Sequence, residues 1–208
     1  MNPWRRNISS SQSIKPYNIY LASSSPYRRS LLSRLGLPFE CLSPSLDETT
    51  HAGETPLQLA NRLAYEKAIA VSKRVSEKSV IIGSDQVACI DSNILSKPGN
   101  HENAKRQLQL SSGKTVEFHT AVCVYNVKTE LIQQAVVPYT AIFRQLSDEM
   151  IENYLIREKP YDCAGAFKSE SLGIALFEKL EGDDPTALIG LPLIQLTSML
   201  EQAGINVI

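Results

Sequence analysis

A serine-rich turn followed by two arginines is the first group of side chains that could do chemistry. The run Ser23-Ser24-Ser25-Pro26 follows a short apolar stretch, and Arg28 and Arg29 come after Tyr27. A helix that starts here would present free backbone N–H groups and the positive end of its dipole, and arginine forks suit phosphate oxygens. The segment therefore predicts a phosphate site, although taken alone it is more typical of an ordinary capped helix.

Two acidic segments could hold a metal ion or accept a proton. Asp85 lies in the run Gly83-Ser84-Asp85-Gln86, directly after an apolar strand predicted at 80–82. The end of a buried strand is where α/β sheets place ligands, and such an aspartate can hold Mg²⁺ or take a proton from water. A turn aspartate that caps backbone N–H groups is an equally good interpretation. Asp47 and Glu48 form a second acidic pair that could sit near a metal, although loop acids are usually solvated.

Two lysines and a glycine-rich segment complete the candidates. Lys97 is held before Pro98-Gly99 and could meet a phosphate, although solvated turn lysines are commoner. Lys67 lies on or beside an apolar helical stripe, where a lysine either snorkels to water or reaches into a cleft. In the run AGAFKSESLG at 164–173, Glu170 could accept hydrogen bonds from a nucleotide base. Taken alone, a glycine-rich connection with a surface acid explains this last segment better.

Composition and missing motifs argue against several other classes of protein. The net charge is −1, so nothing attracts the whole chain to nucleic acid or to an anionic membrane. No run is long enough to span a membrane, and the sequence has no Walker A, G-x-G-x-x-G or G-x-S-x-G motif. The four cysteines lie far apart, and the three histidines do not fall at metal-ligand spacing with them. These features predict a cytoplasmic protein without a zinc or disulfide scaffold.

The elements that must position these residues alternate between strands and helices. Apolar periodicity and capping residues predict helices that start at Pro26 and cover 55–75, 101–110, 148–158 and 192–202. Short strands are expected at 18–22, 39–42, 80–82, 87–90, 94–95 and 174–177, with a long antiparallel pair at 115–127 and 131–143. This order predicts an α/β fold with a mixed sheet. We expect a disordered, serine-rich tail at 1–17 and a single domain at 18–208.

Seven segments, taken together and in this order, resemble the Maf family of nucleotide pyrophosphatases. They are LASSSPYRR at 21–29, DET at 47–49, EKA at 66–68, IGSDQ at 82–86, KP at 97–98, AGAF at 164–167 and GLP at 190–192. The resemblance implies an elongated mixed sheet with flanking helices and two lobes around a cleft. It also implies hydrolysis between the α- and β-phosphates of a small nucleotide substrate, with Mg²⁺ or Mn²⁺. A homodimer is a further expectation, and neither nucleic acid nor a membrane is an expected partner.

The resemblance also implies roles for individual residues. Asp85 matches the family's catalytic acid, which is a metal ligand or a proton acceptor. Asp47 falls in a matching acidic loop. The positions that match residues on the phosphate side of the substrate are Ser23, Arg28, Arg29, Lys67 and Lys97.

Three further positions resemble the branch of the family that hydrolyses 7-methyl-GTP. They are Tyr27, Gln86 and Glu170, although that branch commonly has Trp at position 27 and Gly at position 171. An aromatic face attracts the cationic 7-methylguanine, and a carboxylate can accept hydrogen bonds from its N–H edge. Branches that act on dTTP and UTP typically carry Arg at position 27. A dTTP/UTP pyrophosphatase and a nucleotide-binding regulator of cell division are the alternative hypotheses.

Overall fold

One mixed sheet forms the centre of the protein. The computed structural model describes residues 17–91 and 93–208, so the expected tail at 1–17 lies outside the described residues except for Tyr17. The seven strands have the order β2-β1-β3-β5-β6-β7, and β4 pairs with β3. β1 is parallel to β2 and β3, and all other pairs are antiparallel. The strands are β1 (Asn18–Ala22), β2 (Glu40–Cys41), β3 (Ser79–Ile90), β4 (Asn93–Leu95), β5 (Thr115–Asn126), β6 (Leu131–Phe143) and β7 (Phe177–Glu181). The predicted mixed α/β fold is confirmed.

Capping side chains define where most of the helices begin. Ser25, Thr55 and Ser147 each accept a hydrogen bond from the backbone N–H three residues ahead, which satisfies a donor that the first turn leaves free. The helices are α1 (Pro26–Ser33), α2 (Pro56–Ser72), α3 (His101–Ser111), α4 (Asp148–Glu158), α5 (Pro185–Ile189) and α6 (Leu193–Gln202), with short 3₁₀ turns η1 (Ala164–Ala166) and η2 (Leu172–Leu176). None of the helices in the described ranges is long and apolar enough to cross a membrane.

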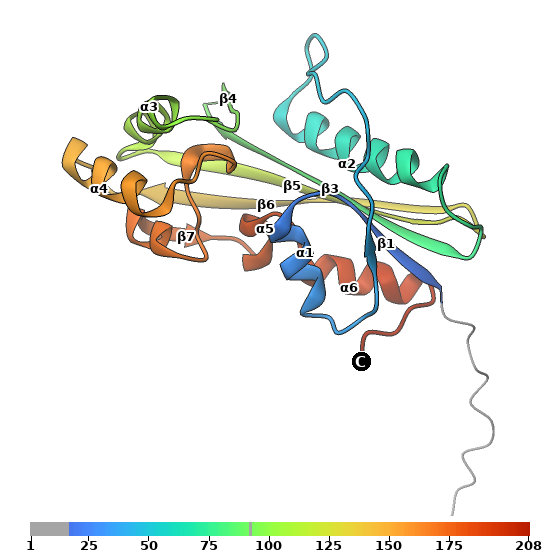
Figure 1. Ribbon diagram of the computed structural model, residues 1–208. Coiled ribbons are helices and arrows are strands. Elements are labelled where there is room, and N and C mark those ends of the chain that lie inside the picture. The colour runs from blue at the N-terminus through green and yellow to red at the C-terminus, as the bar shows by residue number, and fades with distance from the viewer. Residues whose placement is uncertain (1–16, 92) are drawn as a thin grey trace, which may run out of the picture.

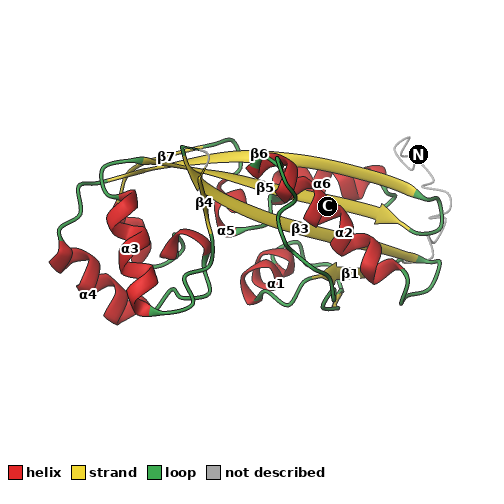
Figure 2. Cartoon of the chain, turned by 90° about the horizontal axis from the view of Figure 1, so that it is seen from above, coloured by secondary structure: helices red, strands yellow, loops and turns green. Residues whose placement is uncertain are grey.

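The long strands β3, β5 and β6 carry two groups of helices. α2 covers one face of the sheet, and α1 and α6 lie on the opposite face (Figure 1). α3 and α4 lie together at the other end of the long strands, as the view from above also shows (Figure 2). Helices α1, α2 and α6 pack on two buried apolar clusters, one under α2 and one under α1 and α6, and a third cluster at the other end includes α3, α4 and β7. The molecule is therefore built in two parts on shared strands.

The segment Gly83–Gln86 is part of a strand, so the prediction that it follows the end of a strand was wrong. β3 runs without a break through it, and pairing with β5 continues from Val80 opposite Asn126 to Cys89 opposite Glu117. Its polar residues suggested a turn, because the sequence does not show that their hydrogen-bond partners come from distant parts of the chain. Asp85 therefore lies in the middle of a rigid strand rather than in a loop.

The predicted strand at 174–177 was also largely wrong. Residues 172–176 form a 3₁₀ turn, and pairing with β6 begins only at Phe177. The backbone N–H of Leu172 donates instead to a carboxylate oxygen of Glu158, and the side chain of Ile174 is exposed. The apolar residues at 174–176 therefore do not belong to a buried strand. Helix α5, with five residues, was too short to give a helical pattern.

Candidate active site

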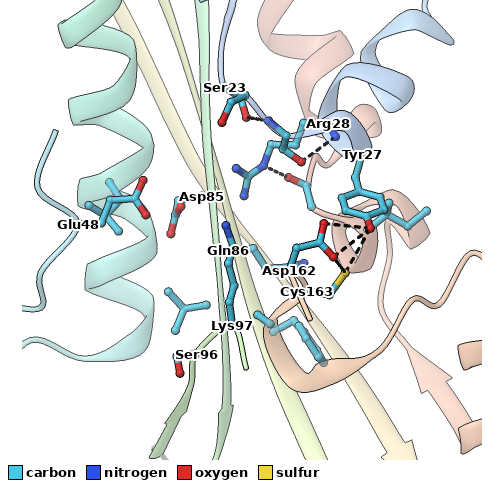
Figure 3. Close-up of a pocket in the computed structure, with 18 of the residues that line it drawn as sticks. Ser23, Tyr27, Arg28, Glu48, Asp85, Gln86, Ser96, Lys97, Asp162 and Cys163 are labelled. Atoms are coloured by element: carbon cyan, nitrogen blue, oxygen red, sulfur yellow. Dashed lines mark hydrogen bonds between the residues drawn. The ribbon is translucent and has the colours of Figure 1, made fainter. Parts of the chain in front are cut away.

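A cleft opens where the start of α1, the middle of β3, and β4 face the loop after α4 (Figure 3). Its volume is about 630 Å³, which lies in the range of small-molecule sites. Among the predicted site residues, those that line the cleft are Ser23, Tyr27, Arg28, Lys67, Asp85, Gln86, Lys97 and Glu170. The fold thus brings together side chains from segments that lie far apart in the sequence.

Lys67 joins two carboxylates at one wall of the cleft. Its Nζ lies 2.6 Å from Oδ1 of Asp85 and 2.8 Å from Oε1 of Glu48. The side chains of Lys67 and Asp85 are only 6% and 9% exposed, whereas that of Glu48 is 55% exposed. A buried lysine is stable as a cation when carboxylates compensate its charge. Lys67 therefore reaches into the cleft rather than snorkelling to water, and its position fixes that of Asp85.

The charge of Glu48 depends on this cluster. Burial works against its ionised form, but the hydrogen bond and the charge of Lys67, with the charges of Lys97 and Arg28, outweigh that effect. The pKa of Glu48 is therefore lowered from its ordinary value of 4.5. A group with a lowered pKa in the folded state stabilises the protein fully above its unfolded pKa, and that contribution is lost as pH falls through the folded pKa.

Replacing Glu48 by Gln is expected to lower stability at pH 7 and to have less effect below about pH 4. The loss at pH 7 should stay within about 1 kcal/mol, because the side chain is half-exposed and solvent screens the pair. Urea unfolding at pH 7, 5, 4 and 3 measures it. Glu178→Gln is a control, since that side chain is exposed and lies outside the cleft lining. The same difference from wild type at every pH would contradict the expectation.

Arg28 is positioned by a carbonyl group from the other end of the chain. Its Nε donates to the carbonyl oxygen of Gly190 at 2.8 Å, and the buried Ser84 hydroxyl donates to the same oxygen at 3.0 Å. Burial lowers the pKa of Arg28, and the negative charges of Asp85 and Glu48 oppose that change. The end of the guanidinium points into the cleft (Figure 3). Arg28 can therefore offer N–H donors to an anionic group there.

The serine-rich turn holds the start of α1 against the cleft. The Ser23 hydroxyl, which is buried, accepts a hydrogen bond from the backbone N–H of Ser25 at 3.0 Å. The Ser25 hydroxyl accepts one from the backbone N–H of Arg28. These bonds fix the first turn of the helix with its positive dipole end at the cleft, where an anion is stabilised.

Gln86 faces away from Asp85, because successive residues of a strand point to opposite faces of the sheet. Its Nε2 donates to the carbonyl oxygens of Ala187 at 2.8 Å and Leu188 at 3.0 Å, and to the Thr120 hydroxyl at 3.0 Å. The amide group therefore ties α5 to the sheet. Gln86 lines the cleft as expected, but in this conformation its N–H donors are used within the protein.

Two of the predicted site residues do not line the cleft. Asp47 closes a turn, since its Oδ1 accepts hydrogen bonds from the backbone N–H of Thr49 at 2.9 Å and from the Thr49 hydroxyl. It is the neighbouring Glu48 that reaches the cleft. Arg29 is exposed and is also absent from the lining among the described residues. The sequence marked both short segments but did not show which of two adjacent side chains faces inward.

The sequence did not predict that Tyr27 contacts Asp162 across the cleft. The Tyr27 hydroxyl lies 3.3 Å from Oδ2 of Asp162, and the Cys163 thiol donates to the same hydroxyl at 3.6 Å (Figure 3). Burial raises the pKa of Tyr27 and that of Cys163, the latter to about 12. Both groups are therefore neutral near pH 7. Asp162 and Cys163 occur in an irregular loop with no motif spacing, so no pattern in the sequence marked them.

A second group of possible metal ligands lies away from the cleft. Cys89, Glu117 and His119 each place one ligand atom within 4.8 Å of the other two. None of the three lines the cleft in the described part of the chain. Linear spacing failed to predict this group because antiparallel pairing of β3 with β5 sets Cys89 opposite Glu117, two residues from His119 on the same face. These residues could hold a metal ion.

Comparison with known proteins gives one family. Residues 18–203 match the family described as Maf-like protein. A relative from Methylobacillus flagellatus, called 7-methyl-GTP pyrophosphatase, is 55% identical over 190 residues, which cover 91% of this chain and 98% of that protein. A protein of the same name from Nitrosococcus oceani is 52% identical over 193 residues, or 93% and 96% of the two chains.

Solved structures give a more distant likeness. A nucleoside-triphosphatase / dITP/XTP pyrophosphatase from Mycobacterium abscessus superposes with a TM-score of 0.41 at 18% identity, over 62% of this chain and 75% of that chain. The Ham1 protein of Staphylococcus aureus superposes with a TM-score of 0.43 at 12% identity, over 61% and 71%.

Proposed function

The chain belongs to the Maf-like protein family, and we propose that it is a nucleoside triphosphate pyrophosphatase that hydrolyses 7-methyl-GTP to 7-methyl-GMP and diphosphate. Relatives that share about half of its residues over nine-tenths of its length bear the name of that activity. The observation that carries the proposal is the cleft itself, in which a buried carboxylate, three basic side chains and a helix start converge. Such an arrangement suits hydrolysis of a phosphate chain.

The triphosphate binds at the basic end of the cleft. Arg28, Lys67 and Lys97 supply the positive charges, and the first turn of α1 supplies backbone N–H groups. Arginine and lysine neutralise the charge that develops on the phosphate oxygens as the α–β bond breaks. Because Arg28 is held by Gly190 and Lys67 by Asp85, these charges are in place before the substrate arrives.

Asp85 orients the attacking water and accepts its proton. The side chain contacts the Lys67 ammonium and sits on a strand that is paired on both sides, so its position is rigid. A general base must lie within hydrogen-bonding distance of the water from which it takes the proton. Lys67 acts as the positioning residue, since its ammonium contacts one carboxylate oxygen of Asp85 and fixes the side chain.

The carboxylates of the cleft fit a divalent cation. Oxygens of both Glu48 and Asp85 lie within 2.8 Å of the single Lys67 nitrogen, so they can face one positive centre. Mg²⁺ and Mn²⁺ take carboxylate oxygens together with phosphate oxygens, and we assign Glu48 and Asp85 as the residues that would hold such an ion. The ion would contribute charge neutralisation at the phosphates. Cys89, Glu117 and His119 offer a softer set of ligands outside the cleft.

The base binds at the opposite end of the cleft, near Tyr27 and Glu170. The Tyr27 ring lines the cleft in the first turn of α1, and Glu170 lines it from the loop before η2. 7-Methylguanine carries a positive charge, which an aromatic face attracts by about 0.5–2 kcal/mol. This attraction alone corresponds to a preference over guanine of about 2- to 30-fold.

Pyrophosphate release from 7-methyl-GTP, GTP, dTTP, UTP and CTP, each with Mg²⁺ or Mn²⁺, tests the proposal. We expect the highest kcat/KM for 7-methyl-GTP, by about 2- to 30-fold over GTP, and loss of activity with excess EDTA. Faster cleavage of dTTP or UTP would keep the reaction but overturn the substrate. Binding of nucleotides without any release would replace the enzyme by a nucleotide-binding protein.

A further inference from the structure

We propose that Asp162 is a specificity-determining residue that selects a positively charged base. This inference rests on the proposed hydrolysis of 7-methyl-GTP. It concerns a residue in the loop that follows α4, outside the segments that marked the site in the sequence.

Asp162 faces Tyr27 from the other wall of the cleft. The two residues are 135 positions apart, and both line the cleft. Oδ1 and Oδ2 of Asp162 lie 3.4 and 3.3 Å from the Tyr27 hydroxyl, so the carboxylate sits beside the ring at the base end (Figure 3). A base that enters between the two walls therefore meets an aromatic ring and a carboxylate together.

The charge of Asp162 has no positive partner among the described residues. Glu48 and Asp85 pair with Lys67, and Glu54 pairs with Arg62, whereas Asp162 forms no ion pair in residues 17–91 and 93–208. Its side-chain contacts there are with the Tyr27 hydroxyl and the Cys163 thiol, which are neutral donors.

A nearby lysine does not neutralise the carboxylate. Lys168, whose charge acts on the neighbouring Cys163, directs its ammonium to the carbonyl oxygen of Glu158 at 2.9 Å. The proposed base end of the cleft thus holds an uncompensated negative charge at Asp162, whereas at the proposed phosphate end the three cations Arg28, Lys67 and Lys97 outnumber the two carboxylates of Glu48 and Asp85. This polarity matches a nucleotide whose phosphates are anionic and whose base is cationic.

The contact with Tyr27 is weak enough for a substrate to replace it. O–H···O hydrogen bonds usually have lengths near 2.7–2.8 Å, and the distances here are 3.3 and 3.4 Å. N–H groups of a purine can therefore take the carboxylate oxygens without a large loss. Guanine and 7-methylguanine share those N–H groups, so it is the charge of the methylated base that the carboxylate distinguishes.

Asp162→Asn is the central test, because it removes the charge and keeps the shape. We expect kcat/KM for 7-methyl-GTP to fall about 3- to 10-fold and kcat/KM for GTP to change little. A loss of this size lies between that expected for an exposed ion pair and that expected for a hydrogen bond to a charged group. Asp183→Asn, in an exposed position outside the cleft lining, should change neither. Equal losses for both substrates, or an unchanged ratio, would overturn the proposal.

Two changes at Tyr27 separate the ring from the charge. Tyr27→Phe removes only the hydroxyl and should keep the preference for the methylated base, since Asp162 stays charged. Tyr27→Arg places a cation beside Asp162 and should abolish the preference through neutralisation and repulsion. Retained preference in the Arg variant would also count against a role for this charge.

A binding measurement keeps this inference separate from the proposed reaction. Calorimetric titration with 7-methyl-GMP and GMP needs no turnover, so it reports on the base end even if no triphosphate is cleaved. Wild type should bind 7-methyl-GMP more tightly than GMP, and Asp162→Asn should lose most of that difference. Failure of pyrophosphate release alone would refute the reaction, whereas no difference between the two ligands in wild type would refute the role of Asp162.

Discussion

Replacing Asp85 by Asn is expected to lower kcat for pyrophosphate release by about 10²–10⁴-fold, the usual loss when a general base is removed. Asparagine has nearly the same shape but cannot accept the proton of the attacking water. The variant should remain folded, because the Lys67 ammonium keeps its contact with Glu48 and an amide oxygen can still face it. Steady-state release of pyrophosphate at saturating 7-methyl-GTP and divalent cation measures the effect.

A matched variant just beyond the same strand controls for loss of charge. Asp91 directly follows β3, is exposed and is not part of the cleft lining, so Asp91→Asn should leave kcat unchanged. Its positive φ of 49° is tolerated by asparagine, which makes the substitution mild. If Asp85→Asn and Asp91→Asn both retained most of the wild-type activity, Asp85 would not be the general base. Another group would then have to activate the water.

Local signals in the sequence were enough to predict most of the elements. The caps Ser25, Thr55 and Ser147 act as expected, because capping is decided within four residues of chain. The long hairpin of β5 and β6 also agrees, since its apolar and β-branched residues continue over the whole of both strands. The mixed character of the sheet followed from this hairpin between alternating strands and helices.

Polar residues inside a buried strand could not be predicted in the same way. Ser84 and Gln86 suggested a turn, and their partners are carbonyl groups near position 190, about a hundred residues away. Tertiary contacts of this kind override local propensity. For the same reason, the sequence could mark Asp47 and Glu48 as an acidic pair but not show that Lys67 contacts Glu48. The Tyr27–Asp162 contact depends on how the two parts of the molecule face each other.

Replacing Gly83 by Ala is expected to have the largest effect on stability, about 3 kcal/mol in the free energy of unfolding. A Cβ at this position would lie 2.1 Å from the carbonyl oxygen of Ala64 and 3.0 Å from the backbone nitrogen of Ala68. Inserting a methyl group into a packed core costs about 1–3 kcal/mol, and the upper end applies here because helix backbone cannot rotate aside as a side chain can. Urea unfolding with a common m-value measures the change.

The double variant Gly83→Ala with Ala68→Gly shows whether backbone is the obstacle. It removes the Ala68 Cβ, which lies 3.1 Å from the added methyl, but leaves the Ala64 carbonyl in place. The double variant should therefore be less stable than Ala68→Gly alone by nearly the full cost of Gly83→Ala, and this comparison allows for the helix stability that a glycine at position 68 itself removes. Relief of the clash requires α2 to move off β3, and α2 carries Lys67 toward Asp85 on that strand. The single variant should therefore lose activity per folded molecule as well. If Gly83→Ala kept full activity and an unchanged unfolding midpoint, the close approach of α2 to β3 would not be needed for stability. The ion pair with Asp85 would then be enough to position Lys67.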